Sequence, residues 1–409
     1  MKKRLLALSL ALCCLFLSGC SMIGIRPDYA TKEDLEAIKD LQSSSTGDSY
    51  NVTVNSTEDS SRLGAAKALL SVVSIQCGFE EIYTSGWFGG QQTVKDTLYY
   101  GSGVIYSLDK AKGDALVITN YHVVYNSAST SENGISEDIS VFLYGQENEQ
   151  DAIKATFVGG SANYDIAVLR ISGSAVIKKS IAAAATFANS DKVSVLDTAI
   201  AIGNPGGMGI SATAGYVSVD SEEITLSVSG NTYVSMRVMR VDTAVNGGNS
   251  GGGLFNESGE LIGIVNAKIA DTSIENIAYA IPANVAKHLA TSILSDENGR
   301  ATRCILGIVP TVSASKAVYD TETGKIAIVE EVSVGSLNED GHAKGKILEG
   351  DIIRALTIDG KRIEITRKYQ VIENMFAARV GSTVVFDIER NGQATTVTFT
   401  ITEAMVTLM

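Results

Sequence analysis

Residues 246–253 of the 409-residue chain read Asn-Gly-Gly-Asn-Ser-Gly-Gly-Gly. Glycines on both sides of Ser250 allow a turn that other residues cannot adopt, and they let another backbone approach closely. Such a turn can direct successive backbone N–H groups at one point, which suits an oxyanion that develops beside a serine nucleophile. Taken alone, the run also fits a glycine-rich surface turn, so residues elsewhere in the chain must decide between the two interpretations.

A serine nucleophile needs a base that titrates near neutral pH, and histidine fits best. The chain has three histidines, which are His122, His288 and His342. His122 lies three residues after the end of the apolar run 115–119, where a strand end would hold it in place. Asp165 opens another apolar run, and a buried aspartate is costly unless it is paired. Pairing with His122 would remove that cost and orient the imidazole. The alternatives are a lone core histidine and a solvent-exposed aspartate at a strand end.

Short apolar or alternating runs with frequent glycine fill the chain from about residue 63 to residue 290. This regular spacing predicts an all-β barrel or sandwich. The clearest runs are 71–76, 103–106, 115–119, 139–144, 165–171, 198–202 and 261–267. Residues 283–294 place Val285, Leu289 and Ile293 on one face, which predicts a closing helix.

A second unit of mixed β and α structure is predicted from about residue 303 onward. An Asp359-Gly360 turn lies inside it, and Asn391-Gly392 is a strong signal for a type I′ hairpin. Its expected elements are strands near 306–312 and 326–332, a helix that opens at 335–337, a motif at 346–353, a helix across 367–379, and strands at 384–390 and 394–401.

Six motifs resemble, in order and approximate spacing, the HtrA (Deg) family of trypsin-like serine proteases. They are Gly101-Ser102-Gly103-Val104-Ile105, 119–124, 165–169, 201–206, 248–252 and Ala280-Ile281-Pro282. The second unit resembles the PDZ domain that these proteases carry. The resemblance implies a mainly β chain, with a chymotrypsin-like double β-barrel at 63–297 and a small α+β PDZ domain at 302–403.

The resemblance also implies a serine endopeptidase that works through an acyl-enzyme, with no metal and no organic cofactor. Ser250 would be the nucleophile, His122 the general base and Asp165 the orienting carboxylate. Backbone N–H groups of Gly248 and Ser250, together with Asn249, would form the oxyanion hole. The alternative is a catalytically weak or silent PDZ-bearing chaperone or binding lipoprotein.

Several residues refine this hypothesis. Asn249 stands where trypsin-type zymogens use an aspartate, so activation should not depend on a freed N-terminal amine. The predicted S1 pocket consists of Ala244, Val265 and Asn266. Ala244 lies six residues before Ser250, where a small apolar residue favours cleavage after small or medium aliphatic residues.

Two glycines depart from the family pattern. Gly247 and Gly253 stand where HtrA proteins usually have proline, and glycine makes a loop more flexible. These glycines leave open whether the oxyanion hole is formed in the resting state, and a resting enzyme that a ligand switches on, by a population shift, would accommodate them.

The start of the second unit resembles the carboxylate-binding loop of PDZ domains, in which a peptide C-terminus extends a sheet edge. The residues that carry this resemblance are Ile305, Leu306, Gly307 and Ile308. The alternative is a plain strand start after a linker. The expected partners are unfolded or misfolded proteins and peptide C-termini, and the family resemblance implies a homotrimer.

The N-terminus predicts export. Residues 1–19 have a basic start and a short apolar run, which are typical of a signal peptide. Leu17-Ser18-Gly19-Cys20 resembles a bacterial lipobox, which implies a lipid on Cys20 and an anchor on the extracytoplasmic face of a bacterial membrane. The alternative is an ordinary secretory signal. Residues 20–62 predict a polar tether with a short helix at 31–42.

Charge and cysteine content exclude other classes of function. The net charge of −13 argues against a nucleic-acid partner, since such binding needs basic patches. Cys77 and Cys304 could form one disulfide in an exported protein, but they lie in different predicted domains, so we expect two buried free thiols.

Overall fold

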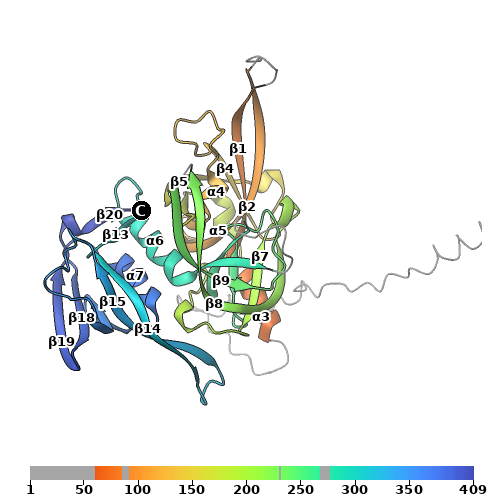
Figure 1. Cartoon of the computed structure of the whole chain (residues 1–409). Helices are drawn as coiled ribbons and strands as arrows, with labels where there is room; N and C mark the ends of the chain where they lie inside the picture. The colour runs from red at the N-terminus through yellow and green to blue at the C-terminus, as the bar shows by residue number, and fades with distance from the viewer. Residues whose placement is uncertain (1–59, 85–91, 230–231, 268–276) are drawn as a thin grey trace, which may run out of the picture. The chain divides into compact units, whose positions relative to one another are not determined.

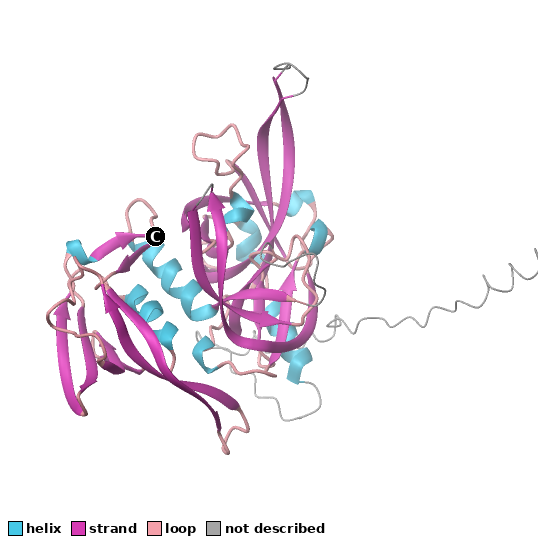
Figure 2. Ribbon diagram, in the orientation of Figure 1, coloured by secondary structure: helices cyan, strands magenta, loops and turns pink. Residues whose placement is uncertain are grey.

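The structure is a computed structural model that describes residues 60–84, 92–229, 232–267 and 277–409 (Figure 1). Strands are the main secondary structure among these residues, and the helices are few and short (Figure 2). Cys20 and the predicted tether helix lie outside the described residues. Within the described part of the chain, no helix has the length and apolar character needed to span a membrane.

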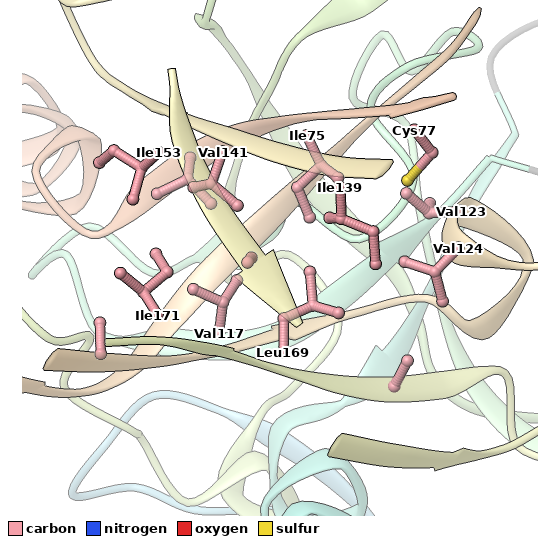
Figure 3. Packing of buried hydrophobic residues seen from close by; sticks show 14 of the residues in the cluster. Ile75, Cys77, Val117, Val123, Val124, Ile139, Val141, Ile153, Leu169 and Ile171 are labelled. Atoms are coloured by element: carbon pink, nitrogen blue, oxygen red, sulfur yellow. The ribbon is translucent and has the colours of Figure 1, made fainter. Parts of the chain in front are cut away.

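The first six strands close into an antiparallel barrel in the order β1-β2-β3-β6-β5-β4. Alternate side chains of these strands point into the barrel, where Ile75, Val117, Ile139 and Leu169 pack together (Figure 3). The helix α3 (Ser60–Leu69) precedes them, and α4 (Tyr121–Val124) follows β3. The strands are β1 (Val72–Thr84), β2 (Gln92–Asp109), β3 (Asp114–Thr119), β4 (Asp138–Leu143), β5 (Ile153–Ser161) and β6 (Ile166–Ile171).

The next six strands close a second antiparallel barrel in the order β10-β11-β12-β9-β8-β7. The predicted closing helix is confirmed as α6 (Ala283–Ser295), in which Val285, Leu289 and Ile293 are buried. The strands are β7 (Thr198–Gly203), β8 (Ser211–Ser229), β9 (Thr232–Val241), β10 (Gly253–Phe255), β11 (Leu261–Asn266) and β12 (Ala278–Pro282). The chain thus has the chymotrypsin-like pair of barrels that its sequence predicts.

Short helical turns connect the barrel strands. They are η1 (Glu149–Asp151), α5 (Ala175–Lys179), η2 (Ser190–Lys192) and η3 (Pro205–Gly207). The first of these lies between β4 and β5, and the last follows β7 directly.

The remaining residues form a six-stranded sheet with its own buried apolar cluster. Its strands are β14 (Ile308–Tyr319), β15 (Ile326–Leu337), β16 (Ile352–Ile358), β17 (Lys361–Glu364), β18 (Thr383–Arg390) and β19 (Gln393–Thr400). The helix α7 (Lys368–Asn374) continues as η4 (Met375–Ala377). A separate pair joins β13 (Thr302–Cys304) to β20 (Val406–Leu408), after η5 (Glu403–Met405). This α+β unit is consistent with a PDZ domain.

Local predictions in this unit had mixed outcomes. Asn391 and Gly392 both have positive φ, 52° and 77°, and they join paired strands, as a type I′ turn requires. The prediction of a helix that opens at 335–337 is wrong. These residues complete β15, since the run pairs with β14 as far as Leu337 opposite Ile308.

Cys77 and Cys304 are free and buried, as predicted. Cys77 lies in the core of the first barrel, and burial raises the pKa of its thiol to about 12. Cys304 belongs to the apolar cluster of the C-terminal unit. A thiol with such a pKa stays protonated near neutral pH, so Cys77 acts as a small apolar core residue.

Candidate active site

His122 lies in the short helix α4, and Asp165 lies in the turn between β5 and β6. The backbone N–H of His122 donates to Asp165 Oδ1 over 2.9 Å, and its ring Nδ1 lies 2.6 Å from Asp165 Oδ2. Because a carboxylate only accepts hydrogen bonds, Nδ1 carries the ring proton. The ring's Nε2 therefore keeps the lone pair that a general base needs.

The backbone at Asp165 is unusual, with φ of 52° in the left-handed region. Aspartate tolerates this conformation better than most residues do. The side-chain amide of Asn120 donates to the main-chain oxygen of Asp165 over 2.8 Å. The amide of Asn266 donates to Asp165 Oδ2 over 2.7 Å. The aspartate is thus held through both its main chain and its carboxylate.

Ser250 lies in the turn before β10, and Ser102 of β2 organises that turn. The Ser102 N–H donates to the Ser250 carbonyl over 2.8 Å, and Ser102 Oγ donates to the Gly248 carbonyl over 2.7 Å. Asn204 N–H in turn donates to Ser102 Oγ over 2.8 Å. Ser102 is fully buried, so a strand of the first barrel anchors the serine turn that belongs to the second.

The turn also packs tightly against the first barrel at Gly251. A side chain there would come within 2.2 Å of both the Ser102 carbonyl and Thr119 Oγ1, and within 3.0 Å of the Asn120 nitrogen. The Gly251 N–H donates to the Val265 carbonyl over 2.9 Å. Only glycine fits here, and this close approach brings the serine turn beside the segment that carries His122.

Two backbone donors in this turn are available. The Gly247 carbonyl accepts the Gly206 N–H over 2.7 Å, and in a trans peptide the next N–H, that of Gly248, points the opposite way. The N–H groups of Gly248 and Ser250 have no acceptor among the described residues. The N–H of Asn249 is used inside the turn, where it donates to the Asn246 carbonyl over 3.0 Å. Of the three residues predicted for the oxyanion hole, Asn249 therefore does not offer its N–H.

The two glycines that depart from the family pattern have different surroundings. A Cβ at Gly247 would meet nothing within 4 Å. Gly253, in contrast, is the first residue of β10 and pairs with both Ile202 and Ile264. A Cβ there would come within 2.2 Å of the buried Phe255 ring. Gly253 therefore lies in the barrel ladder, paired on both sides, and not in the serine turn itself.

The three residues predicted for the S1 pocket differ in their exposure and contacts. Ala244 is exposed, and its carbonyl accepts a hydrogen bond from Thr213 over 2.9 Å. Val265 is 1% exposed and packs in the core of the second barrel. Asn266 faces Asp165. Among the three, only Ala244 has a surface that a substrate side chain could contact.

The loop predicted to bind a peptide C-terminus forms a tight turn at the start of β14. Gly307 has φ of 79°, and a Cβ there would lie 2.5 Å from the Cα of Gly341. The N–H groups of Leu306 and Gly307 have no acceptor among the described residues. Ile308 opens β14, which is an edge strand of its sheet. Ile305 is engaged elsewhere, since its N–H donates to the Met405 carbonyl over 2.7 Å.

Sequence reasoning missed the roles of three residues around the predicted triad. The sequence motifs give no function to Ser102 or Asn120, and they place Asn266 in the predicted S1 pocket. Asn120 and Asn266 are polar residues at the ends of apolar strands. That is the signal by which His122 and Asp165 were found, and it would have identified both asparagines.

Comparisons with known proteins agree with this geometry. The family model for a trypsin-like peptidase domain matches residues 101–264. The Serine protease Do-like HtrA of Lactococcus lactis subsp. cremoris (strain MG1363) is 35% identical over 270 residues, which are 63% of this chain and 61% of that protein. The chain thus spans about three fifths of the length of this relative.

The chain covers a larger share of a second relative. The Serine protease Do-like HtrA of Lactobacillus helveticus is 30% identical over 309 residues, 73% of this chain and 67% of that protein. A solved structure, the HtrA-type protease AlgW with decapeptide, matches with a TM-score of 0.50 and 26% identity over 85% of this chain and 98% of that one. With the two barrels, the ordered motifs and these relatives in agreement, the chain belongs to the HtrA family of trypsin-like serine proteases.

Proposed function

We propose that the chain is a serine endopeptidase, with Ser250 as nucleophile, His122 as general base and Asp165 as orienting carboxylate. The observation that carries this proposal is the Asp165 carboxylate, whose two oxygens hold His122 through its backbone N–H and its Nδ1, while Nε2 has no hydrogen-bond partner among the described residues. The strand β11 ties this pair to the serine turn. The Val265 carbonyl of this strand accepts a hydrogen bond from the Gly251 N–H, and the next residue, Asn266, donates one to Asp165.

The chemistry follows from these contacts. His122 Nε2 accepts the hydroxyl proton as Ser250 Oγ attacks the peptide carbonyl carbon, and Asp165 stabilises the resulting imidazolium. The N–H groups of Gly248 and Ser250 stabilise the negative oxygen. The imidazolium then gives its proton to the leaving amine as the C–N bond breaks. Water, activated by the same histidine, hydrolyses the acyl-enzyme.

Labelling with a fluorophosphonate probe and hydrolysis of unfolded casein test this function. We expect the wild type to be labelled at Ser250, and Ser250→Ala to lose the label and at least about 10⁴-fold of the turnover. A wild type that stays unlabelled, even with denatured protein and C-terminal peptides present, would contradict the proposal. That result would favour the silent binding protein instead.

For the specificity of this site, we propose cleavage after small or medium aliphatic residues, supported by the exposed and apolar Ala244. Profiling with a peptide library measures the preference directly. Ala244→Asp should move it toward lysine and arginine, because the new carboxylate would favour a cationic side chain.

For the C-terminal unit, residues 302–403, we propose a PDZ domain that binds peptide C-termini. Support comes from the unengaged N–H groups of Leu306 and Gly307 and from the edge strand that Ile308 opens. Fluorescence anisotropy with a labelled peptide tests this role. A peptide with a free carboxylate should bind more tightly than its amidated form, and equal affinities would refute the proposal.

The proposed substrates are unfolded or damaged exported proteins. We further propose that Cys20, which lies outside the described residues, carries a lipid anchor on the extracytoplasmic face of a bacterial membrane. Cys20→Ser should then release the protein into the soluble fraction. A homotrimer is proposed from the family resemblance, and sedimentation velocity measures the assembly size.

A further inference from the structure

The β1–β2 hairpin extends well beyond the first barrel (Figure 1). The two strands pair without a register shift from Val72 opposite Val104 to Thr84 opposite Gln92. The strand β4, in contrast, pairs with β1 only over residues 73–78. The hairpin therefore continues past the end of β4.

One face of this hairpin carries a row of exposed side chains. Alternate residues of a strand share a face, and directly opposed residues of two paired strands share it too. Outward from Tyr100, this face carries Leu98, then the opposed pair Asp96 and Glu80, then the opposed pair Val94 and Ile82. We call these six residues the outer stripe. Its four apolar side chains are 44% to 60% exposed, and aligned apolar side chains of this kind mark interaction sites.

The outer stripe begins where the same face of the hairpin packs against the serine turn. Ser102, two residues after Tyr100, donates through Oγ to the Gly248 carbonyl over 2.7 Å. The Tyr100 ring covers Gly207, where a Cβ would lie 3.0 Å from the ring. The next residue, Met208, is 85% exposed. An apolar path therefore leads from the turn of the nucleophile outward along the hairpin.

The hairpin lies on the side of Ser250 that the leaving group takes. A Cβ at Gly101 of β2 would come within 2.5 Å of Val123 Cγ1, so this strand packs beside the residue that follows His122. In the proposed reaction, His122 gives its proton to the leaving amine. We propose that the outer stripe binds the residues of an unfolded polypeptide substrate that follow the scissile bond. This inference rests on the proposed peptidase function.

An extended polypeptide fits the outer stripe because it has the same repeat. Side chains on one face of a strand recur at every second residue, about 6.8 Å apart. Tyr100 and Val94 are six residues apart along β2, a span of about 20 Å. Folded soluble proteins rarely expose an apolar row of this length, so the outer stripe favours an unfolded chain.

Asp96 and Glu80 give the outer stripe a charge preference. The two residues are directly opposed across the strands, where like charges destabilise a sheet. Neither carboxylate has an ion-pair partner among the described residues, and Glu80 Oε2 accepts one hydrogen bond, from Thr130 over 3.4 Å. A lysine or arginine of a bound chain would offset the repulsion. We therefore expect substrates with a basic residue between apolar residues, at alternate positions after the scissile bond.

Two quenched fluorogenic peptides test this inference. Both have the same residues before the scissile bond, and both are amidated so that the proposed PDZ domain does not select between them. The short peptide ends one residue after the bond. The long one continues for about eight residues, enough to reach Val94 when extended, with apolar residues and one lysine at alternate positions. For the wild type, kcat/KM of the long peptide should be higher by about 10-fold, as burial of one aliphatic side chain gives.

A double variant removes the aliphatic side chains of the stripe. In Val94→Ser with Leu98→Ser, the ratio of kcat/KM between the long and the short peptide should fall toward one. Because the ratio is taken within each variant, changes in folding or in the chemical step cancel. Val195→Ser is the matched control, since Val195 is 47% exposed in the loop before β7 and does not belong to the outer stripe. Its ratio should equal that of the wild type.

Asp96→Lys tests the charge preference. For the wild type, replacing the lysine of the long peptide by glutamate should lower kcat/KM by about 5-fold, the scale of exposed ion pairs. Added salt should reduce this effect. In Asp96→Lys the new ammonium group pairs with Glu80, so the lysine and glutamate peptides should be cleaved equally well. A preference for lysine that survives the substitution would overturn the role of the two carboxylates.

The outcomes separate this inference from the peptidase function. A wild type that cleaves both peptides, with an unchanged ratio in Val94→Ser with Leu98→Ser, would overturn the outer stripe as a substrate site and leave the peptidase function supported. If that double variant also forms a smaller assembly by sedimentation velocity, the stripe joins copies of the chain instead.

A binding measurement covers the case of no turnover. An amidated, fluorescently labelled peptide that carries only the residues after the scissile bond is titrated with the full chain, and its anisotropy is followed. A wild type that hydrolyses nothing, yet binds this peptide and loses the binding in Val94→Ser with Leu98→Ser, would refute the peptidase function and support the outer stripe as a polypeptide site. Equal binding by the wild type and the double variant would overturn the inference.

Discussion

Gly247 and Gly248 are adjacent glycines that differ in their tolerance for a side chain. Gly247 lies outside the left-handed region, and a Cβ there meets nothing within 4 Å. We therefore expect Gly247→Ala to raise the free energy of unfolding by about 0.4–1 kcal/mol, because it restricts the unfolded chain. Denaturant titration measures the change, and fluorophosphonate labelling should be retained.

Gly248→Ala is the matched variant with the opposite expectation. Gly248 has φ of 98°, and a Cβ would lie 2.2 Å from the Asn204 carbonyl. The substitution should destabilise the protein and abolish labelling of Ser250, because it displaces a proposed oxyanion donor. Equal effects of the two alanines would show that this turn is not formed as the structure describes it.

Gly253 is the second residue-scale test, because Phe255 occupies the space that a side chain at 253 would need. Gly253→Ala should lower Tm, since the fully buried ring has little room to move. Phe255→Leu in the same chain should recover part of that loss by making room. A double-mutant cycle measures the coupling, and strictly additive effects would contradict this explanation.

At the scale of elements, Asp351 joins the turn before β16 to β18. Its carboxylate accepts the Arg390 guanidinium through two bonds of 2.8 and 2.7 Å and the Leu348 N–H over 2.8 Å. Burial opposes ionisation of Asp351, yet these hydrogen bonds from Arg390 and Leu348 more than offset it and lower its pKa.

This lowered pKa makes stability depend on pH. Since the folded state favours the ionised form, the contribution of Asp351 is present above the ordinary aspartate range and is lost as pH falls through the lowered value. Asp351→Asn should cost about 1.5–3 kcal/mol at neutral pH. Denaturant titrations should show that the difference in the free energy of unfolding between variant and wild type decreases as the solution is acidified. A difference that stays constant with pH would contradict a stabilising role for the ionised Asp351 carboxylate.

The longest strands of the second barrel were not predicted, and their geometry explains why. The pairing of β8 with β9 shifts register between Val217 and Val219 and again between Val219 and Glu222. Each bulge inserts a residue and breaks the period-2 pattern that identifies a strand. The regular ladder of β18 and β19 has no such shift, and the sequence predicted that hairpin within one or two residues.

At the scale of the whole molecule, a buried cluster joins the second barrel to the C-terminal unit. Arg237 of β9 is 8% exposed, and it donates to Glu373 of α7 through two bonds of 2.7 Å. Its guanidinium also lies 3.7 Å from the ring centre of Tyr369 and 3.3 Å from an Asp191 oxygen. Burial alone would lower the pKa of Arg237, but Glu373 and its neighbours reverse the shift.

Removing one partner of this ion pair should destabilise the fold. Arg237→Leu leaves Glu373 buried without its partner, and we expect a loss of about 3–5 kcal/mol in the free energy of unfolding. The double variant Arg237→Leu with Glu373→Leu should recover most of the lost free energy of unfolding, since an apolar pair can replace a buried ion pair. Denaturant titration and limited proteolysis near residue 300 measure the effect. A double variant as unstable as the single one would refute this account.

The sequence by itself determined the candidate chemistry and the order of the barrels. Ser250, His122 and Asp165 could be found because each stands next to a local signal, a glycine run or the edge of an apolar strand. The closing helix and the Asn391-Gly392 hairpin likewise depend on periodicity and turn chemistry within a few residues. These features are encoded over short stretches of chain.

Only the tertiary structure decided how the site is held. Asn266 contacts Asp165 across 101 positions, and Ser102 contacts Gly248 across 146. Gly253 is enclosed by the neighbouring strands and the Phe255 ring. Such contacts join residues from different barrels or strands, and no local periodicity specifies which residues will meet. The physical reason is that closure of the two barrels, rather than any short stretch of sequence, sets these distances.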